Sequence, residues 1–313
     1  MMRSSVDPPS PPESAPAETP PPPGPGPEPA GAPPLLEPPR LRWLALWFLA
    51  VGLPLQLLAG RAPLLARLIV AQLSYAVPAL LWAARSGFQP LRLLRVGPVA
   101  LPGLLLGAGT GVASILAGAG LQTLWRAALP GALVERFDVA SQLSGEHWSP
   151  WLLLAAAALL PALCEELAFR GALQTGLMRR RSPFRAVWGS AVVFAAFHFD
   201  PVRFPALLLL GFVFGWLTWR TGSIWPSAVA HAVNNGAAVL VLSLASAAAA
   251  ADPTDTLPVS AAALLLLAGL GLLALLVGAA NRRLPPAPEL ASFLVPSPAR
   301  RGATTTGGAA PSP

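Results

Sequence analysis

The sequence contains no lysine, a single cysteine and few charged residues of any kind. All 21 basic residues are arginines, which excludes a lysine as a Schiff base or general base. Cys164 stands alone, which excludes an internal disulfide and a cysteine-based metal cluster. Only 11% of the 313 residues are charged, whereas soluble domains carry about 25%. With 54% hydrophobic residues and a mean hydropathy of +0.59, this composition predicts an integral membrane protein.

Proline is concentrated at the N-terminal end of the chain. Sixteen prolines lie between Pro8 and Pro39. Such a segment cannot bury a core, so residues 1–40 are predicted to form a disordered Pro-rich tail. Residues 284–313, rich in Pro, Ala, Gly and Thr, are predicted to form a second disordered tail. No apolar run follows the first Met directly, so we expect no cleavable signal peptide.

Between the tails, residues 41–283 are predicted to form an all-α, multi-pass transmembrane bundle. A length of about 20 apolar residues per span gives about eight spans. They lie near 41–60, 64–84, 98–119, 149–174, 184–200, 203–220, 224–247 and 258–280. The stretch 121–148 is mixed in character, which fits either an extramembrane loop or an interfacial helix.

Two sets of glycines recur every four residues within these segments. They are Gly103, Gly107 and Gly111, and Gly211 and Gly215. Small residues at this spacing let helix backbones approach closely in a membrane, so both sets predict packed helix pairs.

The arginines are divided unevenly between the two sides of such a bundle. With eight spans both termini share one side, and fifteen arginines fall on it. Five fall on the other side, namely Arg61, Arg67, Arg126, Arg136 and Arg203, and the remaining one lies within a helix. The positive-inside rule then predicts a cell-membrane protein with both termini in the cytoplasm. The net charge of +7 therefore indicates topology, and we expect no nucleic-acid partner.

Two adjacent carboxylates follow an almost unbroken apolar run at the end of the fourth segment. Glu166 and Arg170 are spaced i,i+4 with the glutamate first, the favourable order for a helical ion pair. Glu165 points about 100° away around the helix and lacks this local partner. Pro161, four residues earlier, tends to kink the helix and to open space beside Glu165. Because charges at membrane depth are costly, this stretch is a candidate functional site.

Two of the three histidines lie in or beside predicted membrane helices. His198 follows Phe194 by four residues, and His231 precedes Asn235 by four, with Asn234 as the alternative if the register differs. The third, His147, lies in a polar loop. We expect the first two to meet Glu165 in one cavity open to the cytoplasm.

Together these side chains supply the parts of a hydrolytic site. Glu165 can act as general base on a water, and His198 can share that proton or position the water. His231 and Asn235 can donate hydrogen bonds to an oxyanion.

The three motifs resemble those of the CPBP family of intramembrane proteases. They are EExxxR from Glu165 to Arg170, FxxxH from Phe194 to His198, and HxxxN from His231 to Asn235. The family includes CAAX prenyl protease 2 (Rce1-like), Abi and lysostaphin resistance protein A-like domains. The resemblance covers about residues 145–247, which would be the catalytic core.

This resemblance implies a multi-helix endopeptidase with a conical cavity in the membrane. It implies that Glu165 with His198 activates water and that His231 and Asn235 bind the oxyanion. The other two charged residues of the first motif would support the site. Family members are described both as metalloproteases and as glutamate-type proteases. Glu165, His198 and His231 could hold Zn²⁺, but we expect no obligatory metal.

The expected partners are the lipid bilayer and a membrane-associated protein or peptide substrate. The arginine-only composition is typical of a bacterial protein, and the bacterial relatives suggest bacteriocin immunity or peptide maturation. The absence of HExxH, GxSG and GxGD argues against site-2-type, rhomboid-like and presenilin-type proteases. Two alternatives remain: a non-catalytic membrane scaffold, and a proton-coupled transporter that uses the same polar residues.

Overall fold

The computed structural model describes residues 44, 46, 48–137, 149–247 and 257–295. The described residues form helices and turns, without a β-strand element. They belong to one compact unit, Leu35–Pro313, while a second unit, Met1–Pro34, lies outside the described residues. The predicted tail 1–40 and His147 also lie outside them.

The first half of the described chain contains two long helices and four short ones. They are η1 (Phe48–Gly52), α2 (Leu53–Ala59), α3 (Leu64–Arg85), α4 (Pro90–Leu93), α5 (Leu101–Ala127) and α6 (Gly131–Arg136). A proline lies at the first or second position of α2, α4 and α5, where its missing N–H costs no hydrogen bond. The mixed stretch 121–148 thus begins with the end of α5, followed by the short helix α6.

The second half opens with a long helical run of changing geometry. Its elements are α8 (Pro150–Leu153), η2 (Leu154–Leu159), α9 (Leu160–Glu165), η3 (Glu166–Gln174) and α10 (Thr175–Met178). Both η2 and η3 are π-helical, a rare geometry that is frequent at functional sites. After this run come α11 (Pro183–Ala196), α12 (Phe204–Thr221), α13 (Trp225–Ala247), α14 (Val259–Arg283) and the 3-10 helix η4 (Leu290–Phe293).

Five helices of the described chain are long and apolar enough to cross a membrane. They are Leu64–Arg85, Leu101–Ala127, Trp151–Met178, Phe204–Thr221 and Val259–Arg283. Two further apolar helices, Phe48–Ala59 and Pro183–Ala196, are shorter. Each of the eight predicted segments contains a helix, but the number of spans, and with it the orientation of the termini, stays a prediction.

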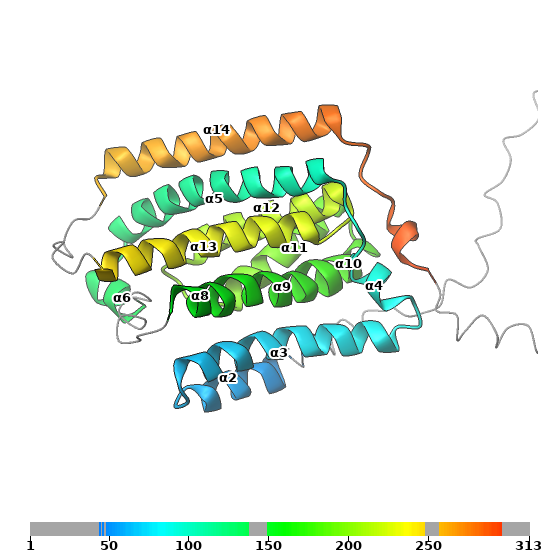
Figure 1. Cartoon of the computed structure of the whole chain (residues 1–313), viewed down its shortest axis with the longest axis horizontal. Coiled ribbons are helices and arrows are strands. Elements are labelled where there is room, and N and C mark those ends of the chain that lie inside the picture. The colour runs from blue at the N-terminus through cyan, green and yellow to red at the C-terminus, as the bar shows by residue number, and fades with distance from the viewer. Residues whose placement is uncertain (1–43, 45, 47, 138–148, 248–256, 296–313) are drawn as a thin grey trace, which may run out of the picture. The chain divides into compact units, whose positions relative to one another are not determined.

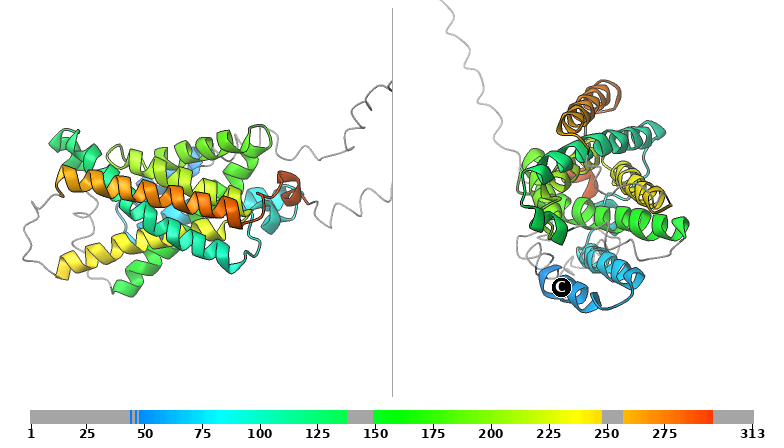
Figure 2. Two further views of the ribbon diagram at one scale, coloured as in Figure 1. Left: turned by 90° about the horizontal axis from the view of Figure 1, so that it is seen from above. Right: turned by 90° about the vertical axis from the view of Figure 1, so that its left-hand side faces the viewer.

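The long helices pack side by side through small residues (Figures 1 and 2). A Cβ at Gly107 on α5 would lie 2.3 Å from the Pro226 carbonyl oxygen on α13, and one at Gly269 on α14 would lie 2.3 Å from the Ala117 backbone nitrogen. At Gly211 on α12 it would lie 3.0 Å from Ala191. The predicted glycine packing is therefore confirmed, because a larger residue would force these backbones apart.

The C-terminal segment differs from the prediction of a tail that is disordered from residue 284. The Arg220 side chain at the end of α12 donates to the carbonyl oxygens of Leu284 and Pro285. Phe293 in η4 lies against the Arg95 guanidinium, with 4.2 Å between Cζ and the ring centroid. Arg95 is 1% exposed, and burial lowers its pKa from 12.5 to about 10. Residues 284–295 therefore pack on the bundle because they cover buried cations, and 296–313 lie outside the described residues.

Candidate active site

The innermost part of the site is the ion pair predicted from the i,i+4 spacing. Arg170 Nη1 lies 3.1 Å from Glu166 Oε1, and neither side chain is exposed. Arg170 also donates from Nη2 to the Gly211 carbonyl oxygen at 3.3 Å, and its Cζ lies 4.3 Å from the centroid of the Phe194 ring. The absence of a side chain at Gly211 brings the α12 backbone within reach of the guanidinium. The pair ties η3 to α11 and α12.

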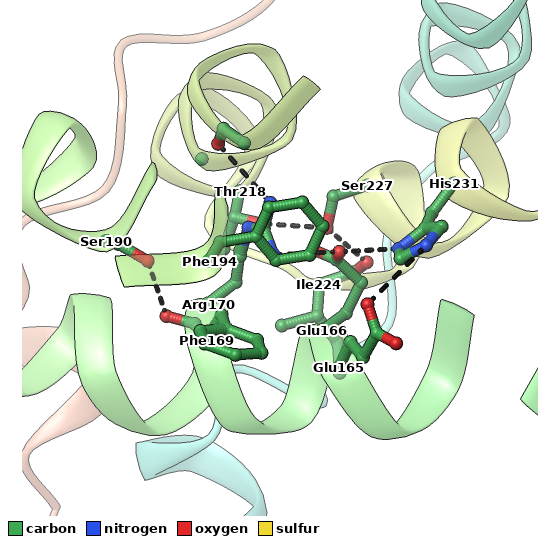
Figure 3. Close-up of polar contacts among 12 residues, drawn as sticks. Glu165, Glu166, Phe169, Arg170, Ser190, Phe194, Thr218, Ile224, Ser227 and His231 are labelled. Atoms are coloured by element: carbon green, nitrogen blue, oxygen red, sulfur yellow. Dashed lines mark hydrogen bonds and ion pairs between the residues drawn. The ribbon is translucent and has the colours of Figure 1, made fainter. Parts of the chain in front are cut away.

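His231 on α13 links the two carboxylates of the EExxxR motif, as Figure 3 shows. Its Nδ1 lies 3.0 Å from Glu166 Oε1, and its Nε2 lies 3.8 Å from Glu165 Oε2. The ring is 4% exposed and stacks on Phe214 at a centroid distance of 5.1 Å. A carboxylate can only accept, so Nδ1 carries the proton that it donates to Glu166. Nε2 can then donate only when the ring is protonated at both nitrogens.

Glu165 has a partner that sequence reasoning missed. Gln72 on α3 donates from Nε2 to Glu165 Oε1 at 3.0 Å, and both side chains are about 95% buried. The second carboxylate oxygen, Oε2, makes no hydrogen bond within the described structure. The signal for Gln72 was its place as a polar residue inside the predicted span 64–84, which by itself indicates a functional position.

His198 lies in the turn that follows α11, rather than inside a helix. Its Nδ1 lies 2.8 Å from the Phe194 carbonyl oxygen, and the two rings meet at a centroid distance of 4.8 Å. Because a carbonyl can only accept, Nδ1 is the donor and Nε2 of the neutral ring carries a lone pair. The next residue, Phe199, has a positive φ of 50°, an unusual conformation for a bulky side chain. At the other end of this turn, Asp200 accepts hydrogen bonds from the backbone N–H groups of Val202 and Arg203.

Both asparagines of the HxxxNN stretch lie beside the site. Asn235 donates from Nδ2 to the Ala157 carbonyl oxygen at 3.3 Å, across to η2. Asn234 donates to Asn235 Oδ1, also at 3.3 Å. The second N–H of the Asn235 amide is then free for another acceptor.

A cavity of about 740 Å³ brings the predicted residues together. The lining includes Glu165, His198, His231, Asn234 and Asn235, with Pro161 beside them. Glu166 and Arg170, in contrast, lie behind the cavity wall and do not line it. Glu165 and His198 are joined by no hydrogen bond among the described residues. Pro161 thus lines the open space that was predicted beside Glu165.

The direction of the cavity shows that two of the sequence-based predictions cannot both hold. The lining extends to Arg126, Phe137 and Arg203, at the end of the bundle where α5 ends and α12 begins (Figure 1). The arginine count assigns this end to the outside, so a cavity open to the cytoplasm is incompatible with the predicted orientation. The cavity reaches this end because Glu165 lies near the middle of the helical run from Pro150 to Met178. In addition, α5 continues to Ala127 and extends the wall at this end.

The residues proposed to hold Zn²⁺ do not form a metal site here. Within the part of the chain that the structure describes, no three His, Cys, Asp or Glu side chains are grouped to hold an ion. His198 and His231 donate from Nδ1 to Phe194 and Glu166, and Glu165 accepts from Gln72 with one oxygen, so these contacts orient the three side chains without engaging either Nε2 or Glu165 Oε2. No step below is therefore routed through a metal.

The comparisons place this arrangement in a family. Residues 147–237 match the family model of the type II CAAX prenyl endopeptidases, described as Rce1-like. This match agrees with the resemblance that the three motifs predicted. The matched Rce1-like segment contains all three motifs, whereas Gln72 lies outside it. No curated protein and no solved structure matches the chain. The match is to a family of peptidases, and the described residues include five apolar helices of spanning length, as expected of a membrane protein.

Proposed function

We propose that this chain is an intramembrane endopeptidase that hydrolyses a peptide bond of a membrane-associated protein or peptide. The observation that carries the proposal is the convergence of the three motifs of the Rce1-like segment on one cavity. Glu165 and His198 contribute an acceptor pair, and His231 and Asn235 contribute donors. These are the two kinds of group that hydrolysis of an amide requires.

The free oxygen of Glu165 is the general base. Oε2 takes a proton from a water molecule whose second hydrogen is held by Nε2 of His198, and the water oxygen attacks the peptide carbonyl carbon. The carboxylic acid of Glu165 then returns the proton to the amide nitrogen as the C–N bond breaks. The products are a new carboxyl end and a new amine end, and the enzyme is regenerated. A positioned base of this kind contributes about 10²–10⁴-fold to the rate.

His231 and Asn235 stabilise the negative oxygen that forms in this step. Asn235 offers the amide hydrogen that Ala157 does not use. His231 lies between the two carboxylates and offers Nε2–H when both ring nitrogens are protonated. Glu166 and Arg170 support the site by holding Nδ1 of His231 from behind. In other enzymes, removing one hydrogen-bond donor to the oxyanion lowers kcat by about 10²–10³-fold.

The chemistry is proposed to need no metal ion. Glu165 has an unbonded oxygen to act as the base and Asn235 has a spare amide hydrogen, so a protein group is assigned to each step. Chelator therefore leaves the activity unchanged, and added Zn²⁺ does not increase it. A bacterial source and a role in bacteriocin immunity stay predictions.

The test compares the wild type with Glu165→Gln on a library of fluorogenic membrane peptides, in detergent and in liposomes, with and without chelator. Glu289→Gln is the matched control, because Glu289 is exposed and does not line the cavity. We expect cleavage by the wild type and the control, and none by Glu165→Gln. Equal cleavage by all three proteins would contradict the role of Glu165.

The same liposomes separate the protease from the two alternatives. Uncoupler-sensitive solute uptake that is lost in Glu165→Gln, without cleavage, would identify a transporter. A scaffold would show neither activity, although the protein would still be folded. Either result would overturn the proposed peptidase.

A further inference from the structure

Helix α3 presents buried polar side chains to the site from outside the Rce1-like segment. Gln72, Ser74 and Tyr75 are each less than 9% exposed, although they belong to an apolar helix of spanning length. Ser74 and Tyr75 accept hydrogen bonds from Gln56 on α2, at 3.2 and 3.3 Å. Of these three side chains, Gln72 is the one that donates a hydrogen bond to Glu165. A buried polar group in a membrane helix needs a partner or a function, and Gln72 has Glu165.

The contact divides the two oxygens of Glu165 between two tasks. Oε1 accepts from Gln72 Nε2 at 3.0 Å, while Oε2 lies nearer to His231 and makes no hydrogen bond within the described structure. Without a partner on Oε1, the carboxylate could rotate about its terminal torsion, which has only broad preferences. The amide thus selects which oxygen is offered to the cavity.

The other end of the same amide is also informative. Gln72 Oε1 is buried and makes no hydrogen bond to any described residue. An amide carries both a donor and an acceptor, so it can donate to the carboxylate of Glu165 and, after turning over, accept from the protonated acid. Gln72 can therefore remain bonded to Glu165 in both protonation states of the proposed cycle. Neither an apolar side chain nor a cation has this property.

We propose that Gln72 is the positioning residue of the general base: its side-chain amide holds one oxygen of Glu165 so that the other points at the substrate. This proposal rests on the peptidase function proposed above. It extends the site to α3, so that the Rce1-like segment without α3 lacks a part of its catalytic geometry.

The test uses Gln72→Met, which keeps the length of the side chain and removes its hydrogen bonding. We expect kcat to fall about 10- to 100-fold, a share of what a positioned base contributes, while KM stays within about twofold. Gln72→His restores an N–H donor and is expected to recover part of the lost kcat. Ser74→Ala is the matched control, because it removes a buried polar group of the same helix that does not contact Glu165.

A second measurement does not depend on activity. The thermal midpoints of the wild type, Gln72→Met, Glu165→Ala and the double variant form a cycle, and residues in contact show non-additive shifts. We expect the double variant to lose less than the sum of the two single shifts. Additive shifts overturn the proposal, and so does an unchanged kcat in Gln72→Met. If the shifts are non-additive but the wild type cleaves no peptide, the contact is present and the proposed peptidase function is overturned, and with it the catalytic role of Gln72.

Discussion

Arg170 Nη1 lies 3.1 Å from Glu166 Oε1, and neither side chain has any exposure to solvent. Replacing one member of such a pair leaves the other as an uncompensated buried charge. We therefore expect Arg170→Met to lower the free energy of unfolding by about 3–5 kcal/mol. The measurement is thermal and chemical unfolding of the purified protein in detergent.

Arg203→Met is the control for this prediction, because the Arg203–Asp200 pair has an arginine side chain that is 40% exposed. Exposed pairs contribute about 0–1 kcal/mol. If both variants lose the same free energy of unfolding, burial does not determine how much the Glu166–Arg170 pair contributes to stability.

The two histidines of the cavity are expected to behave differently when replaced. His231→Ala removes the partner of buried Glu166, so it lowers both kcat and the thermal midpoint. His198→Ala removes a half-buried ring that bonds to the Phe194 carbonyl, so kcat falls with little change in the midpoint. The expected loss in kcat is about 10²-fold or more for each. Equal midpoints in the two variants would contradict the structural role of His231.

Gly107→Ala tests the close approach of α5 and α13. The new Cβ would lie 2.3 Å from the Pro226 carbonyl oxygen, which is backbone and cannot move aside locally. We expect a loss of about 1–3 kcal/mol, as for other overpacked sites, and reduced activity because α13 carries His231. Gly118→Ala, which meets nothing within 4 Å on the same helix, is expected to be neutral or stabilising.

The end of the bundle at which the cavity opens can be assigned by cysteine labelling. Cys164 is the only native cysteine, so Cys164→Ser provides a background for Arg126→Cys and Arg92→Cys. With the arginine-rich end in the cytoplasm, an impermeant maleimide labels Arg126→Cys in intact cells and Arg92→Cys only after lysis. The reverse pattern would show that the positive-inside rule fails for this chain and that the cavity opens to the cytoplasm.

The contact between Phe293 and Arg95 is expected to stabilise the fold without affecting the chemistry. Phe293→Ala removes a ring that lies 4.2 Å from the guanidinium, a contribution of about 0.5–2 kcal/mol. Unfolding in detergent measures the loss, and Ser292→Ala, an exposed neighbour, is the control. If Phe293→Ala unfolds like the wild type, the contact between Phe293 and Arg95 does not contribute to the stability of the fold.

Local spacing predicted the parts of the site that lie on one helix. The Glu166–Arg170 pair and the glycine packing were predicted from i,i+4 spacing, because residues four apart lie on the same side of a helix. The family followed from three motifs that are each encoded within six residues. Helix positions along the chain were also correct, since long apolar runs leave few alternatives in a membrane.

Relationships between distant segments could not be obtained in this way. Gln72 and Glu165 are 93 positions apart, and their contact depends on how α3 rotates about its axis. The contact between His231 Nδ1 and Glu166 joins residues 65 positions apart, so local spacing could not predict it. The direction of the cavity depended on helix ends, and α5 proved longer than its apolar run because Gln122 and Arg126 continue the helix.

The contact between Gln72 and Glu165 also bears on how the chain enters the membrane during synthesis. The helical run from Pro150 to Met178 emerges with two carboxylates, and one arginine neutralises one of them. His231 is made only later, on α13, whereas α3 is already present. An unpaired Asp at the centre of an inserting helix costs about 2.5–3.5 kcal/mol, which indicates the scale for Glu165. Gln72 can therefore offer Glu165 a hydrogen-bonding partner before His198 and His231 have been synthesised.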